Sequence, residues 1–281
     1  MKIATTIKEV RKQVADWKRE GLTVGLVPTM GALHEGHASL VDAAKEQCDR
    51  VVTSVFVNPT QFAAGEDLDD YPRDFDRDCG ILEAHGCDLV FHPGVEEMYP
   101  EGAATFVELR SDMTKQLCGK SRPEHFCGVC TVVSKLFHIA MPDKAFFGEK
   151  DAQQLAVIRQ MTRDLLFGIE IVGCPTKREE DGLAKSSRNT YLSPEERKAA
   201  LILSKTVALG KELAKTEKYA NKVVEAMKKN IETEPMAKID YVEAVDALSM
   251  EPVEKLEGTC MLAMAVYIGK TRLIDNTLIN E

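Results

Sequence analysis

The sequence predicts an α/β protein, with a parallel-sheet domain in its N-terminal part and a smaller α+β domain in its C-terminal part. Up to about residue 174, apolar runs of strand length alternate with amphipathic helical runs, which is typical of βαβ units around a buried sheet. After Pro175 and the polar run 177–182 the alternation of strands and helices ends. The rest of the chain has predicted helices followed by predicted strands.

The first predicted helix has Ile7, Val10, Val14 and Trp17 on one face, with Thr5 or Thr6 as its cap. Strands and helices then alternate. The predicted strands are residues 22–27, 51–57, 89–92, 144–147 and 169–174. The predicted helices are residues 38–48, 76–85, 129–139 and 152–166. This order predicts a Rossmann-like parallel sheet that gathers its ligands at the carboxyl ends of the strands.

In the C-terminal part, Ser193 and Pro194 are typical of an N-cap followed by proline at the first helical position. The predicted elements are helices at 195–215 and 219–231 and strands at 240–245 and 260–268. We therefore expect two domains, residues 1–180 and residues 181–281. The charged residues of the two helices are most simply a solvated face.

Composition limits the class of protein. Hydrophobic residues make up 44% and charged residues 29% of the 281, which is ordinary for a folded globular chain. A net charge of −9 argues against a general nucleic-acid binder, which needs a basic face. No apolar run approaches the ~20 residues of a membrane span, and the N-terminal residues lack a signal-peptide core, so we expect no membrane association and a cytoplasmic location. In that compartment most of the eight cysteines should be free thiols.

The most informative stretch is residues 28–37, PTMGALHEGH, between the predicted strand 22–27 and the helix 38–48. A strand-to-helix loop offers backbone N–H groups and the positive end of the helix dipole, both of which favour bound phosphate. Gly31 and Gly36 let the backbone approach a ligand closely, and the imidazoles of His34 and His37 can donate hydrogen bonds to phosphoryl oxygens. The pattern predicts transfer at a nucleotide phosphate.

The HEGH sequence in this setting resembles the HxGH signature of the nucleotidylyltransferase superfamily, which includes the class I aminoacyl-tRNA synthetases. The fuller string is similar to the pantothenate synthetase (pantoate–β-alanine ligase) family. Further segments that resemble this family follow in order along the chain. They are 56–62 (FVNPTQF), 70–73 (DYPR), 122–133 (RPEHFCGVCTVV), 147–155 (FGEKDAQQL), 181–189 (DGLAKSSRN) and 272–276 (RLIDN).

The resemblance implies an ATP-dependent ligase that condenses (R)-pantoate with β-alanine. A pantoyl-adenylate would form first, and the products would be pantothenate, AMP and pyrophosphate. Residues 1–180 would bind ATP and pantoate, and residues 181–281 would cover the active site. Mg²⁺ is expected with ATP, held mainly by phosphates, with no protein ligand assigned. The resemblance also suggests a homodimer.

The resemblance assigns catalysis to four residues: His34, His37 as proton donor, Lys150 and Arg188. The implied ATP-binding residues are Met30, Gly31, Ala32, Leu33, His34, Glu35, Gly36, His37, Gly148, Glu149, Lys150, Asp151, Lys177, Lys185, Ser186, Ser187 and Arg188. Residues 185–188 would form the mobile phosphate loop, the counterpart of the KMSKS loop of the synthetases. Gln61 and Gln154 would bind pantoate, and Gln61 would also touch β-alanine.

Two positions depart from the family pattern. Lys185 stands where methionine or leucine is usual, and Lys177 where a small apolar residue is usual. We expect the Lys185 side chain to point to solvent, because the other donors of the loop suffice for phosphate. If position 177 contacts adenine through its backbone, the side chain there matters little.

Other polar residues have simpler explanations. His85, His92 and His138 lie in or beside apolar segments and are expected to be structural. Cys127 and Cys130 form a CxxC without the partners of a zinc site, so they are expected to pack in the core. Residues 119–121 (GKS) lack the first glycine of a P-loop.

Acids at the start of the predicted helix 76–85 could bind metal, yet capping and the helix dipole alone explain Asp74, Asp76 and Asp78. Arg122 and His125 match the family, and the sequence leaves their roles open.

Two other functions are considered for this motif, and the sequence disfavours both. An adenylyltransferase that stops at a nucleotide product is disfavoured by Gln61 and Gln154 with their flanking motifs. A catalytically silent nucleotide-binding protein is disfavoured because His34, His37, Lys150 and Arg188 occur together.

Overall fold

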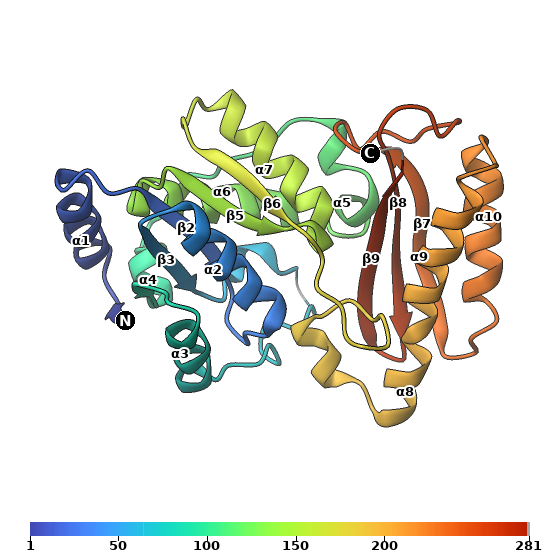
Figure 1. Cartoon of the computed structure of the whole chain (residues 1–281), viewed down its shortest axis with the longest axis horizontal. Helices are drawn as coiled ribbons and strands as arrows, with labels where there is room; N and C mark the ends of the chain where they lie inside the picture. The colour runs from blue at the N-terminus through green and yellow to red at the C-terminus, as the bar shows by residue number, and fades with distance from the viewer. Residues whose placement is uncertain (64, 280–281) are drawn as a thin grey trace. The chain divides into compact units, whose positions relative to one another are not determined.

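The computed structural model describes residues 1–63 and 65–279, and its contacts divide the chain into two compact units. Figure 1 labels most of the helices and strands. The first unit consists of Met1–Leu109, Glu124–Glu149 and Val157–Pro175. The second unit consists of Arg110–Pro123, Lys150–Ala156 and Thr176–Glu281. The expected domains at 1–180 and 181–281 stay a prediction.

The first unit is built on a six-stranded sheet in the order β1-β4-β3-β2-β5-β6, with every pair parallel. Its strands are β1 Lys2–Ala4, β2 Val24–Thr29, β3 Arg50–Val55, β4 Leu89–Phe91, β5 Lys144–Gly148 and β6 Glu170–Cys174. The Rossmann-like prediction is confirmed. Strand β1 was not expected, because its three residues are too few to show a period.

Helices connect these strands. They are α1 Ile7–Arg19, α2 Glu35–Gln47, α3 Phe75–Ala84, α4 Val95–Met98, α6 His125–Ala140 and α7 Ala152–Asp164. Thr6 caps α1 in a capping box with Glu9, which settles the choice between Thr5 and Thr6. Between α2 and the sheet, buried apolar side chains form a continuous core, including Val27, Val41 and Phe146.

The strand order places the loop after β2 at a functional position. From β2 the sheet continues through β3 and β4 on one side and through β5 and β6 on the other. In open parallel sheets, ligands bind at the carboxyl edge where the strand order reverses in this way. The end of β2 at Thr29 and the end of β5 at Gly148 border this switch point.

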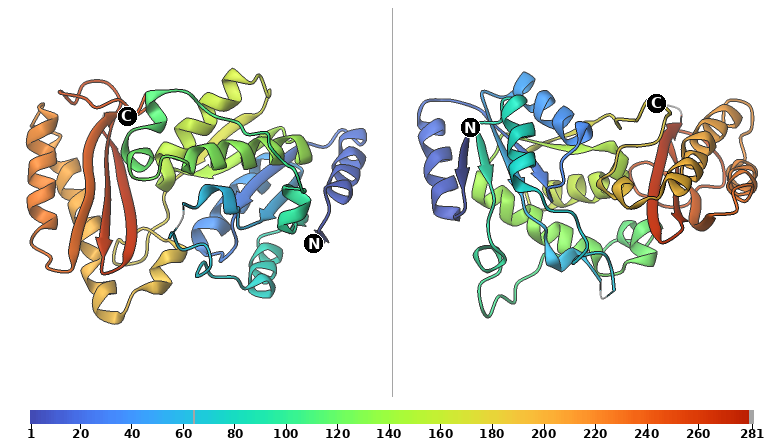
Figure 2. Two further views of the ribbon diagram at one scale, coloured as in Figure 1. Left: turned by 180° about the vertical axis from the view of Figure 1, so that it is seen from behind. Right: turned by 90° about the horizontal axis from the view of Figure 1, so that it is seen from below.

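The second unit is an α+β structure around a three-stranded antiparallel sheet, β7 Ala237–Asp246, β8 Cys260–Ile268 and β9 Thr271–Ile279. Its helices are α5 Leu117–Ser121, α8 Pro194–Ala199, α9 Leu201–Leu213 and α10 Ala220–Ile231. The helices α9 and α10 pack against the sheet (Figure 2). Ser193 caps α8 as predicted, but the single helix expected at 195–215 is wrong, because the chain divides into α8 and α9 at Ala200.

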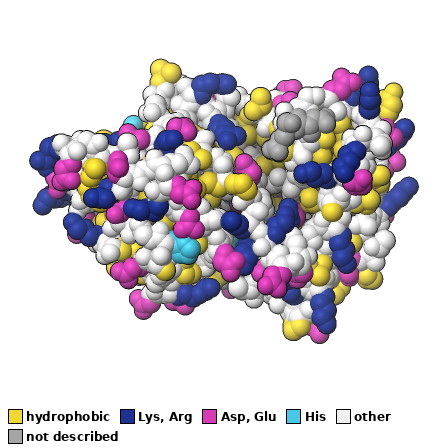
Figure 3. Space-filling model, in the orientation of Figure 1, with side chains coloured by type: hydrophobic (Ala, Val, Ile, Leu, Met, Phe, Trp, Pro, Cys, Tyr) yellow, Lys and Arg dark blue, Asp and Glu magenta, His cyan; other side chains and the backbone are white. Residues whose placement is uncertain are grey.

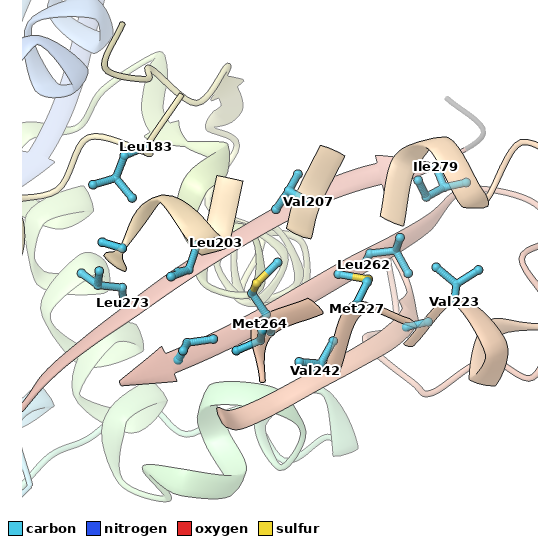
Figure 4. Packing of buried hydrophobic residues seen from close by; sticks show 14 of the residues in the cluster. Leu183, Leu203, Val207, Val223, Met227, Val242, Leu262, Met264, Leu273 and Ile279 are labelled. Carbon is cyan, nitrogen blue, oxygen red and sulfur yellow. The ribbon is translucent and has the colours of Figure 1, made fainter. Parts of the chain in front are cut away.

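Aliphatic and sulfur-containing side chains fill the space between these helices and the sheet, as Figure 4 shows for Leu203, Met227, Leu262 and Met264. Gly210 lets α9 approach both α10 and the sheet closely, because a Cβ there would lie 2.7 Å from Met227 Sδ on α10 and 2.9 Å from Leu262 Cδ1 on β8. This core holds β9 in place.

Among the described residues, no helix is long and apolar enough to span a membrane. Lysine and arginine side chains are interspersed with acidic ones on the face seen in Figure 3.

Candidate functional site

The turn between β2 and α2 has an unusual backbone. Gly31 has φ +84°, and a Cβ there would lie 3.0 Å from an Asp78 carboxylate oxygen and 3.2 Å from Val55. Ala32 follows with φ 50°, in the left-handed region that residues with a side chain rarely adopt. Such a residue costs roughly 1–3 kcal/mol and persists only where its surroundings hold it.

Asp78 on α3 holds this turn. Its carboxylate accepts hydrogen bonds from the backbone N–H of Ala32 at 2.9 Å and of Leu33 at 2.7 Å. Asp78 is 1% exposed, and burial raises the pKa of its carboxyl group although the two N–H donors act in the opposite direction. The explanation of Asp78 as an ordinary acid at a helix start is therefore wrong, whereas Asp74 does cap α3 by accepting from Arg77 N–H.

The turn presents both motif histidines at the start of α2. His34 is the N-cap, and its Nδ1 accepts from Gly36 N–H at 3.1 Å. The Nδ1 of His37 accepts from His34 N–H at 3.3 Å, and the two rings lie 4.1 Å apart. An Nδ1 that accepts places the hydrogen of a neutral imidazole on Nε2. The geometry therefore gives two Nε2–H donors at the positive end of the α2 dipole, which suits phosphate oxygens.

Gln61 lies against the same turn. It belongs to the 3-10 turn η1, Pro59–Gln61, and its Nε2 lies 3.0 Å from the Sδ atom of Met30. Its Oε1 accepts from Asn58 Nδ2 at 3.1 Å, and Asn58 is itself 1% exposed and accepts from Tyr99 Oη. Asn58, which orients the Gln61 amide, was not among the predicted site residues. Its place in the FVNPTQF segment is the signal that could have identified it.

Helix α6 packs against η1. His125 Nδ1 lies 2.9 Å from the Gln61 carbonyl oxygen, so the structure gives His125 a contact with this turn. A Cβ at Gly128 would lie 2.3 Å from the Thr60 carbonyl oxygen, so only glycine permits this approach. Arg122, the other residue left open, is the C-cap of α5 in the second unit.

Lys150 follows β5 in the 3-10 turn η3, Glu149–Asp151. Its side chain is 20% exposed, and its Nζ lies 3.7 Å from Asp151 Oδ1. The Lys150 carbonyl oxygen accepts from Asn276 Nδ2 at 2.9 Å. The backbone of this lysine is therefore tied to β9, while its ammonium group has a long ion pair with its neighbour.

Two adjacent glutamines of α7 have different roles. The Gln153 amide is 6% exposed and bonds the N–H of Cys118 at 3.0 Å and the carbonyl groups of Met113 and Gln116 at 2.8 Å each. Gln154 is half-buried, and within the described part of the chain its amide makes no hydrogen bond. Gln153 is therefore a scaffold amide, and Gln154 is the one available to a ligand.

Residues 177–185 form a short hairpin that leads into the predicted phosphate loop. Lys185 N–H donates to the Lys177 carbonyl oxygen at 2.9 Å, and the Lys177 side chain is exposed. The expectation that Lys185 points to solvent is wrong: its side chain is 14% exposed and its Nζ lies 3.3 Å from Glu179. Ser186 then caps the 3-10 turn η4, Ser187–Tyr191, by accepting from Arg188 N–H at 3.3 Å.

The other histidines have structural contacts. His85 Nδ1 lies 2.7 Å from a carboxylate on α2, and His92 Nδ1 lies 2.7 Å from the Val55 carbonyl oxygen. His138 packs edge-on against Phe167, with the ring centres 5.3 Å apart.

All eight cysteines are free thiols. Burial raises the pKa of Cys130 to about 12 and also raises the pKa of Cys127, so neither thiolate is favoured at neutral pH. Within residues 1–63 and 65–279, no group of three or more His, Cys, Asp or Glu side chains is arranged to hold a metal ion.

The predicted site residues thus form two sets, one in each unit. The first unit contains Met30, Gly31, Ala32, Leu33, His34, Glu35, Gly36, His37, Gln61, Gly148 and Glu149. The second contains Lys150, Asp151, Gln154, Lys177, Lys185, Ser186, Ser187 and Arg188. Contacts within the first set join Met30 with Gln61 and His34 with His37. Within the second they join Lys150 with Asp151 and Lys177 with Lys185.

Known proteins resemble the chain over nearly its full length. Residues 2–278 match the family described as pantoate-beta-alanine ligase. The pantothenate synthetase of Enterococcus faecalis is 58% identical over 277 residues, which is 98% of each chain, and that of Clostridium acetobutylicum is 57% identical over the same share.

Two solved structures are also similar. The crystal structure of pantothenate synthetase from Thermus thermophilus has a TM-score of 0.94 and 46% identity, over 99% of both chains. The pantoate-beta-alanine ligase of Francisella tularensis, complexed with beta-gamma ATP and beta-alanine, has a TM-score of 0.81 and 34% identity, over 99% of this chain and 97% of that one.

The hydrogen bonds of Asp78 predict a specific effect on nucleotide binding. Asp78→Asn keeps the side-chain size but offers one acceptor oxygen in place of two, so it cannot hold both N–H groups of the strained turn. Losing such a charged hydrogen bond is worth about 1.5–3 kcal/mol, and we expect ATP affinity to fall roughly tenfold or more. Titration calorimetry with ATP measures this change. Asp76→Asn is the control, because it removes an exposed carboxylate from the same helix turn. Equal ATP affinities of the two variants would contradict the role of Asp78.

Proposed function

The chain belongs to the pantoate-beta-alanine ligase family and is an ATP-dependent ligase; we propose that it condenses (R)-pantoate with β-alanine through an enzyme-bound pantoyl-adenylate. The observation that carries the proposed chemistry is the turn after β2, where Asp78 holds a strained backbone and two imidazoles present Nε2–H donors at a helix N-terminus. Such donors match a reaction in which negative charge accumulates on phosphate oxygens.

The reaction proceeds in two steps. A carboxylate oxygen of pantoate attacks the α-phosphorus of ATP, the bond to the β-phosphate bridging oxygen breaks, and pyrophosphate leaves. The amine of β-alanine then attacks the acyl carbon of the adenylate, AMP leaves with the electrons of the acyl–oxygen bond, and the amine loses a proton. The first step needs charge stabilisation at phosphate, and the second needs an activated acyl group.

His34 and His37 are proposed to donate to the phosphates, with His37 as the proton donor. Their Nδ1 atoms are occupied by backbone N–H groups, so each ring has one defined donor atom, Nε2–H. Lys150 and Arg188 are proposed to neutralise phosphate charge, and Ser186 and Ser187 to add hydroxyl and backbone donors. Preorganised donors of this kind stabilise the transition state without reorganising during the reaction.

The remaining ATP-binding assignments follow the chain. Met30 through Leu33, with Glu35 and Gly36, would line the nucleotide site, and Gly148, Glu149 and Asp151 would hold ribose and phosphates. Lys177 would contact adenine through its backbone, an assignment that its exposed side chain supports.

Gln61 and Gln154 are proposed to bind pantoate. The acid offers hydroxyl groups and a carboxylate, and an amide supplies both a donor and an acceptor. The fixed orientation of Gln61 by Asn58 and the absence of a scaffold bond at Gln154 within the described residues support this assignment.

Mg²⁺ is proposed to accompany ATP. The assigned donor set is cationic and rich in N–H groups, which suits the oxygens of phosphate, and an ion held by those same phosphates would add positive charge where pyrophosphate leaves. A homodimer and a cytoplasmic location are proposed from family membership, and size-exclusion chromatography with light scattering tests the first.

We expect pyrophosphate–ATP exchange to require pantoate but not β-alanine, because the acid is activated before the amine attacks. Labelled pyrophosphate is supplied with ATP, and each substrate is omitted in turn. Exchange only in the presence of β-alanine, or formation of ADP and phosphate, would refute the adenylate mechanism.

Lys150→Ala and His37→Ala should each lower the rate of adenylate formation by ~100-fold or more, because each removes a preorganised donor to developing charge. Single-turnover quench-flow measures the rate, and thermal unfolding measures stability, which should change little. Near-normal rates in both variants would exclude these residues from the chemistry.

The two neighbouring glutamines provide a matched pair for testing substrate recognition. Gln154→Ala should raise the KM for pantoate, leave ATP affinity within a small factor, and reduce the preference over an analogue lacking one hydroxyl, because an amide that bonds a substrate hydroxyl discriminates against its loss. Gln153→Ala should instead lower the melting temperature, since it removes the hydrogen bonds that the Gln153 amide makes to the Cys118 N–H and the Met113 carbonyl. Unchanged pantoate kinetics in Gln154→Ala would show that Gln154 does not bind pantoate and has a structural role instead.

A further inference from the structure

Two adjacent residues of β9, Asp275 and Asn276, are tied to both phosphate-binding segments of the second unit (β9 is dark red in Figure 1). The Asp275 side chain is 2% exposed, and its two oxygens accept from Nη1 and Nη2 of Arg178 at 2.8 Å each. This bidentate pair raises the pKa of Arg178, although burial acts in the opposite direction. Because the guanidinium group is planar, two parallel hydrogen bonds to one carboxylate fix the orientation of the Arg178 side chain as well as its distance from Asp275.

Arg178 lies in the stem of the hairpin that precedes Arg188. The stem is closed by Glu179 N–H to Leu183 O at 2.8 Å and by Lys185 N–H to Lys177 O at 2.9 Å. Arg178 Nη1 also donates across the stem to Gly182 O at 3.1 Å. Through this arginine, Asp275 therefore holds the hairpin that leads directly into the predicted phosphate loop.

Asn276 provides the second connection. Its Nδ2 donates to the Lys150 carbonyl oxygen at 2.9 Å, and its own backbone N–H donates to Asp275 Oδ1 at 2.8 Å. The same carboxylate oxygen thus receives Arg178 and the backbone of Asn276. Neither the Asp275–Arg178 pair nor the Asn276 hydrogen bond uses the Lys150 ammonium group, because Asn276 binds the backbone carbonyl of Lys150.

We propose that Asp275 and Asn276 are positioning residues of the ligase, which set the relation between Lys150 and the hairpin that leads to Arg188. The inference rests on the proposed function, which assigns both cations to the phosphates of ATP. β9 is held by the core of the second unit, with Leu273 and Ile279 buried in it (Figure 4). A rigid strand therefore fixes two parts of the charge-stabilising machinery through backbone and stem atoms.

Asn276→Ala tests the connection to Lys150, because it removes the side-chain hydrogen bond to the Lys150 carbonyl oxygen without leaving a buried charge. Displacement of a catalytic group by about 1 Å can cost ~100-fold in rate, so we expect pantoate-dependent pyrophosphate–ATP exchange to fall tenfold or more. ATP affinity and melting temperature should stay near those of the unmodified protein. Thr277→Ala, on the same strand, is the matched control and should leave the exchange rate unchanged. An exchange rate of Asn276→Ala within twofold of the unmodified protein, or an equal loss in Thr277→Ala, would overturn the proposal.

A double variant separates positioning from a general structural role. If Asn276 acts through Lys150, adding Asn276→Ala to Lys150→Ala should lower the rate no further, whereas a further tenfold loss would overturn the proposal. Arg178→Lys keeps the charge but loses the fork, and it should be equally non-additive with Arg188→Ala. Absence of pantoate-dependent exchange in the unmodified protein would refute the proposed function itself. If the unmodified protein shows normal exchange and Asn276→Ala exchanges at the same rate, only the positioning role would be refuted.

Discussion

The strained turn between β2 and α2 is the constraint on which the first unit's chemistry depends. Gly31 and Ala32 both have positive φ, and the Asp78 carboxylate compensates by accepting from the backbone N–H groups of Ala32 and Leu33. Burial raises the pKa of the Asp78 carboxyl group, and the two N–H donors act in the opposite direction. A strained turn held by a buried acid is typical of places where geometry serves function.

The position of the histidines follows from this turn. Once Leu33 is fixed, His34 becomes the N-cap of α2, and its imidazole together with that of His37 accepts from backbone N–H groups at the start of the helix. Each ring is thereby fixed in orientation and tautomer, and its donor is Nε2–H. Because η1 is held by Asn58 and by the close approach of Gly128, Gln61 occupies a defined place beside Met30. Substrate binding by Gln61 would need no rearrangement of this backbone.

Sequence periodicity was sufficient for the parallel sheet and the HxGH turn, because both depend on local pattern. Periodicity did not predict the features that depend on contacts between residues far apart in the sequence. Asp78 contacts a turn 46 residues away along the chain, and no local signal separates it from Asp76. Gln153 and Gln154 are identical in type, and a rotation of about 100° around α7 sends only the first toward the segment that it bonds. The break at Ala200 and the strand β9 were missed because packing against the second core, and not residue propensity, determines them.

In each unit, a buried acid holds a segment with a proposed role in phosphate binding by accepting hydrogen bonds from the scaffold. The chain has a net charge of −9, yet it is proposed to bind phosphates, so an acid that orders the phosphate-binding segments needs hydrogen-bond donors of its own. Asp78 faces two backbone N–H groups, and Asp275 faces the guanidinium fork of Arg178 and one N–H group. Each acid bonds backbone or stem atoms, and neither contacts the side chains of His34, His37 or Lys150 in the hydrogen bonds described above. Rigid anchoring and the proposed binding of phosphate are therefore compatible in an acidic protein, because each anchoring acid is directed at donors of the scaffold.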